Sequence, residues 1–324
     1  MGFIKDRFKN TESSRDIVGL DIGYSAIRSV VLESSGPALT LKHYCVEPLS
    51  LGLTQHWPTH AKEQITAGIK RSLATIDTYS KHCVIAVPDS VITSRWLRFD
   101  SATAEDIETA LHAAVEEYIP CPLDDIYFDY QVFDTYSTDQ NYLDVLLVAC
   151  RKEQVDARLE IVHYAGLTPL SVEINSHVIR WTYARLYSAN LMQTCILVDI
   201  GATHLTLSFG SETQQMYSCH ENMIALVSKE TILQRVQQFF SLFYLSYPYH
   251  QFNKLIFIGS DRLLLEFLIE KLTDLYGLKI EILILEQHLL LFCSHVNQEE
   301  FISLFPTLFL SFSLAFRGLK ASLL

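Results

Sequence analysis

The tripeptide Asp-Ile-Gly occurs twice in this chain, once in each half, at Asp21–Gly23 and at Asp199–Gly201. Each copy follows a short apolar run and precedes a second run of strand-forming residues. Two short strands joined by a glycine-containing turn predict a β-hairpin. A single copy would indicate only a tight turn in which glycine relieves the backbone. Because the two copies share the same flanking pattern and lie too far apart for a solenoid repeat, they predict a duplicated domain.

The chemistry of these turns favours a nucleotide. A turn of this kind presents backbone N–H groups that suit phosphate oxygens, and an aspartate at the strand end can hold a hydrated Mg²⁺. We therefore expect Asp21 and Asp199 to face a magnesium ion through its water molecules. A later turn, Gly259-Ser260, joins a buried strand to a helix and would receive the adenosine. The residues expected to bind ATP or ADP are Gly23, Tyr24, Ser25, Gly201, Ala202, Thr203, Gly259 and Ser260.

An additional module interrupts the first half of the chain. Residues 94–166 follow the order β-α-β-β-α, with a first helix capped by Thr103 and a second helix closed by Gly166. The predicted fold is therefore α/β, with two lobes that have duplicated sheet cores and one inserted module. We expect residues 1–93, 167–190 and 305–324 to form the first lobe, 94–166 the module and 191–304 the second lobe.

The composition narrows the classes of partner. The formal net charge is −12 and no cluster of Lys and Arg occurs, which excludes a general nucleic-acid binder. Hydrophobic residues make up 49% of the chain, and this value indicates an apolar surface kept for protein partners. The seven cysteines are scattered without a Cys-x-x-Cys pair, as expected of free thiols in a reducing compartment.

Both ends of the chain are candidates for membrane segments. The first sixteen residues carry seven charged side chains and no apolar run, so they are not a signal peptide. Residues 1–9 are mildly basic and amphipathic, and are either a frayed terminus or a weak contact with a membrane surface or partner. The apolar stretch Phe301–Phe316 contains Pro306 and is short for a span, so we expect a buried helix and only peripheral contact with the membrane.

Motifs along most of the chain, from Val18 to Arg317, resemble the actin-like ATPase superfamily and, within it, the PilM family of type IV pilus assembly. The Asp-Ile-Gly elements mark the superfamily, whereas the run Tyr-Ile-Pro-x-Pro-Leu-Asp is specific to the family. The matching segments are Gly19–Gly23, Ala86–Pro88, Glu117–Asp125, Asp144–Ala149, Arg151–Glu153, Ala165–Leu167, Val198–Gly201 and Leu314–Arg317.

The resemblance implies a two-lobed protein with ATP between its lobes and a module shared with the division protein FtsA. PilM proteins bind the N-terminal tail of the membrane protein PilN beside that module, which implies a cytoplasmic protein under the inner membrane. Other pilus assembly proteins are also expected partners, and self-association is open. The run Tyr118–Asp124 leaves a helix through two prolines, so an extended peptide could dock beside it. Alternatively, these prolines only end the helix.

Some residues depart from the family pattern. Tyr24 and Arg28 stand where relatives usually have a small residue and a lysine, and Gly259-Ser260 replaces a Gly-Gly turn. Glu173 is the candidate catalytic residue, but Asn175 occupies the place of a carboxylate and cannot act as a general base. The second lobe is also short between Ser218 and Lys254, where the usual Ala-Glu-x-x-Lys segment is not recognisable.

These departures predict an ATP-binding scaffold with weak or no ATP turnover. The alternatives are an FtsA-like cell-division or secretion adaptor, and an actin-superfamily ATPase or sugar kinase. A secretion protein of this type should run into a transmembrane helix, and a sugar kinase should be longer with a catalytic aspartate in a separate lobe.

Overall fold

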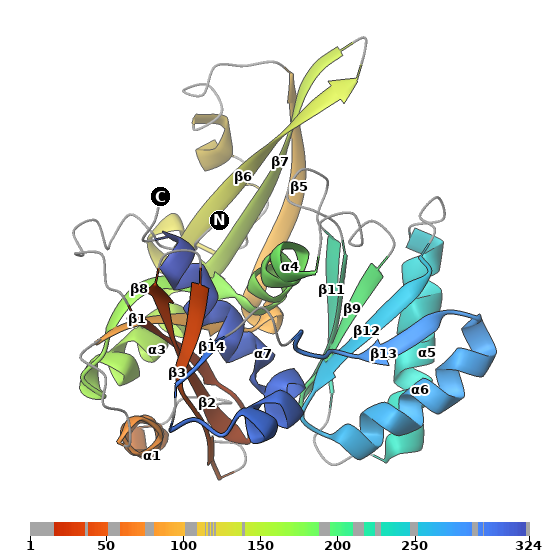
Figure 1. Ribbon diagram of the computed structural model, residues 1–324. Coiled ribbons are helices and arrows are strands. Elements are labelled where there is room, and N and C mark those ends of the chain that lie inside the picture. The colour runs from red at the N-terminus through yellow and green to blue at the C-terminus, as the bar shows by residue number, and fades with distance from the viewer. Residues whose placement is uncertain are drawn as a thin grey trace.

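The chain folds into two lobes side by side and a module that projects from between them (Figure 1). Each of these three parts has its own β-sheet. The structure is a computed structural model that describes residues 16–35, 38–50, 59–74, 81–100, 109–113, 115, 117, 119, 121–137, 140–187, 195–209, 217–223, 228–246, 252–286, 291–293 and 295–321. The predictions for residues 1–9, Thr103 and Tyr118 lie outside these residues.

The first lobe is built on a six-stranded sheet with the order β14-β3-β2-β1-β4-β8. Strands β1 and β2 form the first predicted hairpin, and β1, β4 and β8 run parallel. The bounds are β1 Asp16–Ile22, β2 Ala26–Ser35, β3 Ala38–Pro48, β4 His82–Val87, β8 Thr168–Ile174 and β14 Leu291–Phe292. Helices α1 (Thr59–Leu73) and α3 (Lys152–Tyr164) pack on one face, where Val18 and Leu20 point.

The second lobe repeats this plan with the order β11-β10-β9-β12-β13. Strands β9 and β10 form the second predicted hairpin, and β9 runs parallel to β12. The bounds are β9 Cys195–Ile200, β10 His204–Phe209, β11 Tyr217–Asn222, β12 Lys254–Gly259 and β13 Lys279–Ile282. Helices α5 (Lys229–Ser246) and α6 (Arg262–Tyr276) cover one face, and the described residues between β11 and β12 contain no other helix.

A shared layer of helices joins the two sheets. Helices α4 (Asn175–Leu186) and α7 (Gln298–Ala321) pack on the inner faces of both lobes, in one cluster that includes Val84 from β4 and Leu197 from β9. The chain returns to the first lobe through α7, which contacts β1, β2, β4 and β12. The lobes are therefore parts of one body with a common core.

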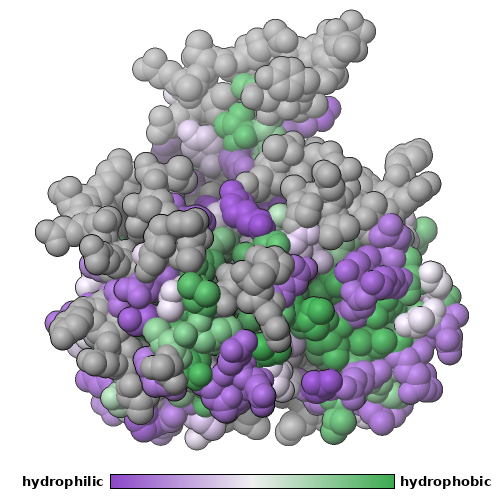
Figure 2. Space-filling view, in the orientation of Figure 1, coloured by the Kyte–Doolittle hydropathy of each residue, from purple (hydrophilic) through white to green (hydrophobic). Residues whose placement is uncertain are grey.

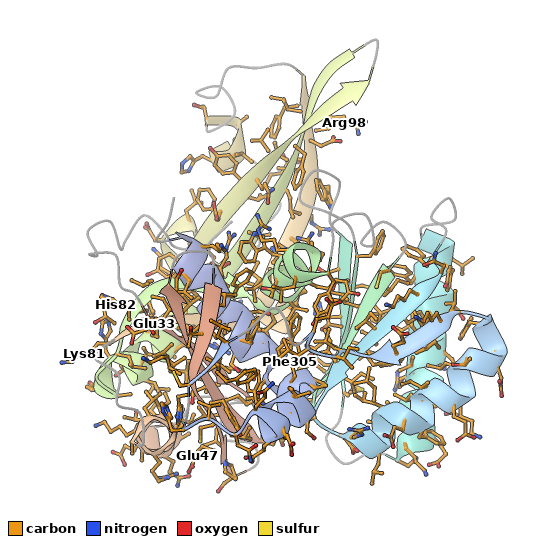
Figure 3. All side chains as sticks on the ribbon, viewed as in Figure 1. Glu33, Glu47, Lys81, His82, Arg98 and Phe305 are labelled. Carbon is orange, nitrogen blue, oxygen red and sulfur yellow. The ribbon has the colours of Figure 1, made fainter. Side chains whose placement is uncertain are left out.

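Helix α7 confirms the prediction of a buried helix over Phe301–Phe316. Phe305, labelled in Figure 3, is fully buried, as are Phe309 and Phe312. A Cβ on Gly19 would lie 1.9 Å from the carbonyl oxygen of Ser311, so only glycine lets α7 approach β1 this closely. Within the described residues α7 alone has the length and hydropathy of a membrane span, but its apolar side chains pack inside the protein.

The inserted module is a three-stranded antiparallel sheet with the order β5-β7-β6. Its strands are β5 Ile92–Asp100, β6 Ile126–Ser137 and β7 Gln140–Arg151, and short helical turns η2 (Asp89–Val91) and η3 (Leu123–Asp125) precede β5 and β6. Helical residues 109–113 pack on one face through Leu111. Arg98, at the far end of the module in Figure 3, forms a two-pronged ion pair with Asp144 at 2.7 and 3.1 Å.

The element order of the module is as expected, but its last helix packs elsewhere. Helix α3 follows β7 directly and joins the first-lobe cluster through Val155 and Ile161, against α1 and β8. The inner face of β7 contributes Leu146 and Val148 to the same cluster. The module is thus anchored on the first lobe by its own strand and by α3.

Hydrophobic side chains also reach the surface of the second lobe (Figure 2). They are Leu242 and Leu245 on α5, Leu263 and Leu275 on α6, and Ile284 after β13, each more than half exposed. These exposed side chains account for part of the high apolar content of the chain.

Candidate functional site

The turns of the two hairpins line one cleft of about 550 Å³ between the lobes. Strand β1 runs parallel to β4, and strand β9 runs parallel to β12 in the other sheet. Both β1 and β9 end at this cleft, which brings the two Asp-Ile-Gly copies together. The turn after β12 closes a further side. The structure therefore gathers the residues predicted for nucleotide and metal in one place: Asp21, Gly23, Tyr24, Ser25, Asp199, Gly201, Ala202, Thr203, Gly259 and Ser260.

The two hairpin turns have the same hydrogen bond at their base. The N–H of Gly23 donates to the carbonyl oxygen of Ala26 at 3.0 Å, and that of Gly201 donates to the carbonyl oxygen of His204 at 3.0 Å. Both glycine amides are therefore engaged within their own turns. A phosphate oxygen would therefore bind the N–H groups of the next two residues of each turn, which are Tyr24-Ser25 and Ala202-Thr203.

Each strand-end aspartate already has a cationic partner. Arg28 donates from Nη1 to Asp21 at 3.1 Å, and His204 Nε2 lies 3.0 Å from an oxygen of Asp199. The partners lie over the glycines of the turns. A Cβ on Gly23 would come within 2.8 Å of Arg28 Nη1, and one on Gly201 within 2.1 Å of the His204 ring.

Burial and charge act together on these groups. Burial raises the pKa of Asp21 above its ordinary value, although Arg28 opposes this effect. Burial alone would lower the pKa of His204, but Asp199, Asp89 and Asp21 outweigh it, so the His204 pKa is raised. The His204 ring is therefore held towards its charged form, with Asp199 as the carboxylate that favours this form most.

The carboxylates do not suit the expected Mg²⁺. A hydrated magnesium ion needs free, negatively charged oxygens around it, whereas Asp21 and Asp199 are each neutralised by a cation from their own hairpin. Over the described ranges no group of three or more His, Cys, Asp or Glu could hold a metal ion. In addition, Nε of Arg28 is buried and has no hydrogen-bond partner among the described residues.

Sequence reasoning missed three charged residues of this region. His204 follows the second turn and was not singled out. Arg158 is buried on α3 and lines the cleft, and burial lowers its pKa to about 10, so it stays charged at neutral pH. Asp89 accepts hydrogen bonds from the N–H and the hydroxyl of Ser176 and so caps α4. Asp89 directly follows the family motif Ala86–Pro88, which was the available signal.

Glu173 lies away from the cleft. Its side chain is buried, accepts a hydrogen bond from the Ser171 hydroxyl at 3.1 Å, and lies 3.6 Å from Nε of Arg317. It does not line the cleft, whereas Asn175 does. The strand alternation of β8 turns Glu173 towards α7, so this geometry gives no support to a water-positioning role.

A family model described as "Type IV pilus assembly protein PilM" matches residues 19–224 of the chain. The chain belongs to the PilM family. The resemblance read from its motifs is thereby confirmed. A solved PilM–PilN type IV pilus biogenesis complex is similar over 95% of this chain and 99% of that chain, with 18% identity and a TM-score of 0.77.

Two other solved structures match with lower TM-scores. The cytoplasmic domain of EpsL, an inner-membrane component of the Vibrio cholerae type II secretion system, is 10% identical over 92% of this chain and 94% of its own, with a TM-score of 0.45. The ethanolamine utilization protein EutJ from Carboxydothermus hydrogenoformans is 12% identical over 97% and 94%, with a TM-score of 0.46. The predicted actin-like α/β fold is confirmed for this PilM family member.

A second cavity of about 400 Å³ lies where the module meets the first lobe. Its floor is apolar, with Arg151 and Glu153 at the exposed rim. The described part of the PilM-specific run contributes Ile119 and Cys121 to its wall. The apolar lining residues are Val91, Ile92, Ile119, Ile126 and Ala149.

The two cavities of this PilM protein share a wall. Ser90 and Val91 from η2, together with Gln154 from α3, line both of them. The cap residue Asp89 lies in the same turn. A ligand in either cavity therefore touches residues that border the other.

Proposed function

We propose that this chain is a nucleotide-binding scaffold of the type IV pilus inner-membrane assembly complex, with weak or no ATP turnover. It docks the N-terminal tail of a PilN-like membrane protein and lies on the cytoplasmic side of that membrane, which it contacts only peripherally. Membership in the PilM family gives the pilus assembly role. The docked tail, the bound nucleotide and the location are the parts that we add.

The cavity beside the module is the observation that carries the docking proposal. It combines an apolar floor with a charged rim, which suits a peptide that inserts an apolar side chain and keeps polar groups at the edge. The proline-containing segment at Ile119 and Cys121 forms part of its wall, as an extended peptide would require. The cavity also adds no group in a catalytic arrangement.

Filling this cavity tests the docking proposal. Cys121→Trp and Thr93→Trp each place a large ring at the cavity wall. Binding of a synthetic peptide with the N-terminal cytoplasmic residues of the PilN-like protein from the same genome is measured by fluorescence anisotropy. We expect both variants to weaken binding by at least about tenfold. Leu275→Trp puts the same ring on the exposed face of α6 and should leave the affinity unchanged; equal affinity in all three variants would place the tail elsewhere.

The cleft supports binding of ATP or ADP, whose phosphates would contact the residues after each turn glycine. Turnover needs a positioned water and a general base. Asn175 lines the cleft but cannot accept a proton, and Glu173 is engaged with Arg317. We therefore expect a rise in melting temperature with ATP or ADP and no sustained phosphate release from ATP. Steady release over many turnovers would contradict the scaffold role.

Magnesium was expected with the nucleotide, through Asp21 and Asp199. There it would share these carboxylates with Arg28 and His204, each of which contacts one oxygen of its aspartate.

A further inference from the structure

The charges that line the cleft are balanced, unlike those of the whole protein. The chain carries a net charge of −12, yet the charged side chains that line the cleft are two aspartates, two arginines and one histidine. The aspartates are both paired, by Arg28 and by His204, and Arg158 is an additional buried cation. The lining of the cleft is therefore neutral to positive, although the protein as a whole is acidic.

A divalent metal normally solves a problem that this cleft does not have. Where two bare carboxylates face a polyphosphate, all charges repel and the metal ion bridges them. Here the carboxylates are already neutralised from within the hairpins, by cations that lie directly over the turn glycines. A metal ion added to the same space would have to share Asp21 with Arg28 and Asp199 with His204, so each carboxylate would have less charge to offer it.

Arg28 lines the cleft, and one of its donors has no hydrogen-bond partner within the described ranges. One guanidinium nitrogen serves Asp21, while the buried Nε has no partner among the described groups. A buried unsatisfied donor costs stability until an acceptor arrives. The guanidinium of Arg28 lies beside the first turn and can bind a phosphate oxygen there, since arginine binds phosphate with several parallel N–H groups.

We infer that the cleft binds the phosphates of its nucleotide through Arg28 and His204 and does not require a divalent metal. This inference rests on the nucleotide-binding part of the proposed function and specifies how that part works. The two side chains take the place of the metal between the carboxylates and the phosphates. Arg28 is the stronger of the two because its planar guanidinium can donate several parallel N–H groups to a phosphate.

Calorimetric titration with ADP and with ATP tests this inference on the full chain, once with magnesium and once with EDTA. We expect the dissociation constants in the two buffers to agree within about threefold. A loss of affinity of tenfold or more in EDTA would overturn the inference and leave nucleotide binding intact. If ADP and ATP fail to bind in either buffer, the nucleotide part of the proposed function fails and this inference fails with it.

Variants identify the residues responsible. Arg28→Lys keeps a positive charge beside Asp21 but removes the planar guanidinium, and should weaken binding in EDTA by about tenfold, the value of one charge-assisted hydrogen bond. The double variant Arg28→Ala, His204→Ala frees both carboxylates and should make nucleotide binding depend on magnesium. Arg235→Ala removes a surface pair with Glu221 at 2.9 Å outside the cleft and serves as the control. Unchanged affinity of Arg28→Lys in EDTA would contradict the role of the guanidinium.

Manganese alone, followed by its electron paramagnetic resonance signal, gives a readout without nucleotide. The unaltered chain should leave the ion free in solution, and the double variant should bind it through Asp21 and Asp199. Binding of manganese by the unaltered chain, lost in Asp21→Asn, would show a working metal site and overturn the inference. Urea unfolding of each variant verifies that it is folded before these measurements.

Discussion

The two hairpins have turns of the same kind, but they differ in which residue neutralises the aspartate at the end of the strand. Each has the Asp-Ile-Gly sequence and the same 3.0 Å bond at its base. In the first, the cation is Arg28, directly across the strand pair from Asp21. In the second, the residue across from Asp199 is Thr206, and the cation comes instead from His204 at the end of the turn. Two different positions therefore give the same result, a buried aspartate with its own cation.

The strands that lead into the hairpins also differ. At the position two residues before the aspartate, β1 has Gly19 and β9 has Leu197. Helix α7 touches the backbone of β1 at this glycine, whereas Leu197 is buried in the layer shared by the lobes. At this position the first lobe therefore contacts α7 through its backbone, whereas the second lobe contributes a side chain to the shared cluster. The duplication supplies two similar halves, and α7 makes them unequal.

The largest expected effect comes from giving β1 the residue of β9. Gly19→Leu forces a side chain into the space of the Ser311 carbonyl, and we expect a loss of more than about 4 kcal/mol in the free energy of unfolding, or failure to fold. Leu197→Ala leaves a cavity instead and should cost about 2 to 4 kcal/mol. Urea unfolding followed by circular dichroism measures both. A soluble Gly19→Leu chain with nearly unchanged stability would refute the close contact with α7.

The two cations should differ in their value to stability. Arg28 and Asp21 are 13% and 15% exposed at the side chain, so Arg28→Met leaves a nearly buried charge and should cost about 2 to 3 kcal/mol. His204 is 33% exposed, and His204→Leu should cost about 1 kcal/mol.

Adding Asp21→Asn to Arg28→Met tests the cause, because it removes the uncompensated charge. The double variant should recover a good part of the stability lost by Arg28→Met, as read from urea midpoints. If the second substitution makes matters worse, the loss comes from packing of the arginine stem and not from the ion pair.

A histidine in the layer between the lobes should make the protein sensitive to acid. Burial, with Arg180 and Arg317 nearby, lowers the pKa of His177 to about 3. Its folded pKa lies below the unfolded value, so its contribution to stability is complete above pH 6.5 and is lost as the pH falls from there towards 3. Between pH 6.5 and 5.5 the loss should approach about 1 kcal/mol. His177→Asn should flatten this part of the stability profile; an unchanged slope would exclude His177 as its source.

The smallest effect is expected at a surface pair of the second lobe. Arg262 and Glu266 face each other at 2.8 Å on α6, with both side chains largely in water. Arg262→Ala should change the unfolding free energy by less than about 0.5 kcal/mol. Against this value, the cost of Arg28→Met measures how much burial adds to the same kind of ion pair.

Much of the fold follows from local sequence. The alternation of β1 and β2, the glycine turns and the apolar run of α7 are visible as patterns, because hairpins and buried helices depend on residues close in the chain. Pro306 did not end α7, since its neighbours on the helix are held by tertiary packing. The assignment of α3 to the first-lobe core could not be read from the chain, because both lobe and module offer it an apolar surface.

The sequence by itself determined that two strand-turn-strand units with an aspartate at the strand end would meet at one cleft, and which turn residues would line it. Tertiary structure decided how deeply the charged groups of that cleft are buried, and it added Arg158 from α3 to them. Glu173 faces Arg317 on α7, and Asp89 caps a helix that begins at Asn175, far along the chain. Hydrogen bonds within a hairpin are local, but the strength of a charge and its partner depend on burial by segments distant in sequence. The metal expected at Asp21 and Asp199 was inferred from residue type, and the packed side chains of Arg28 and His204 are what argue against it.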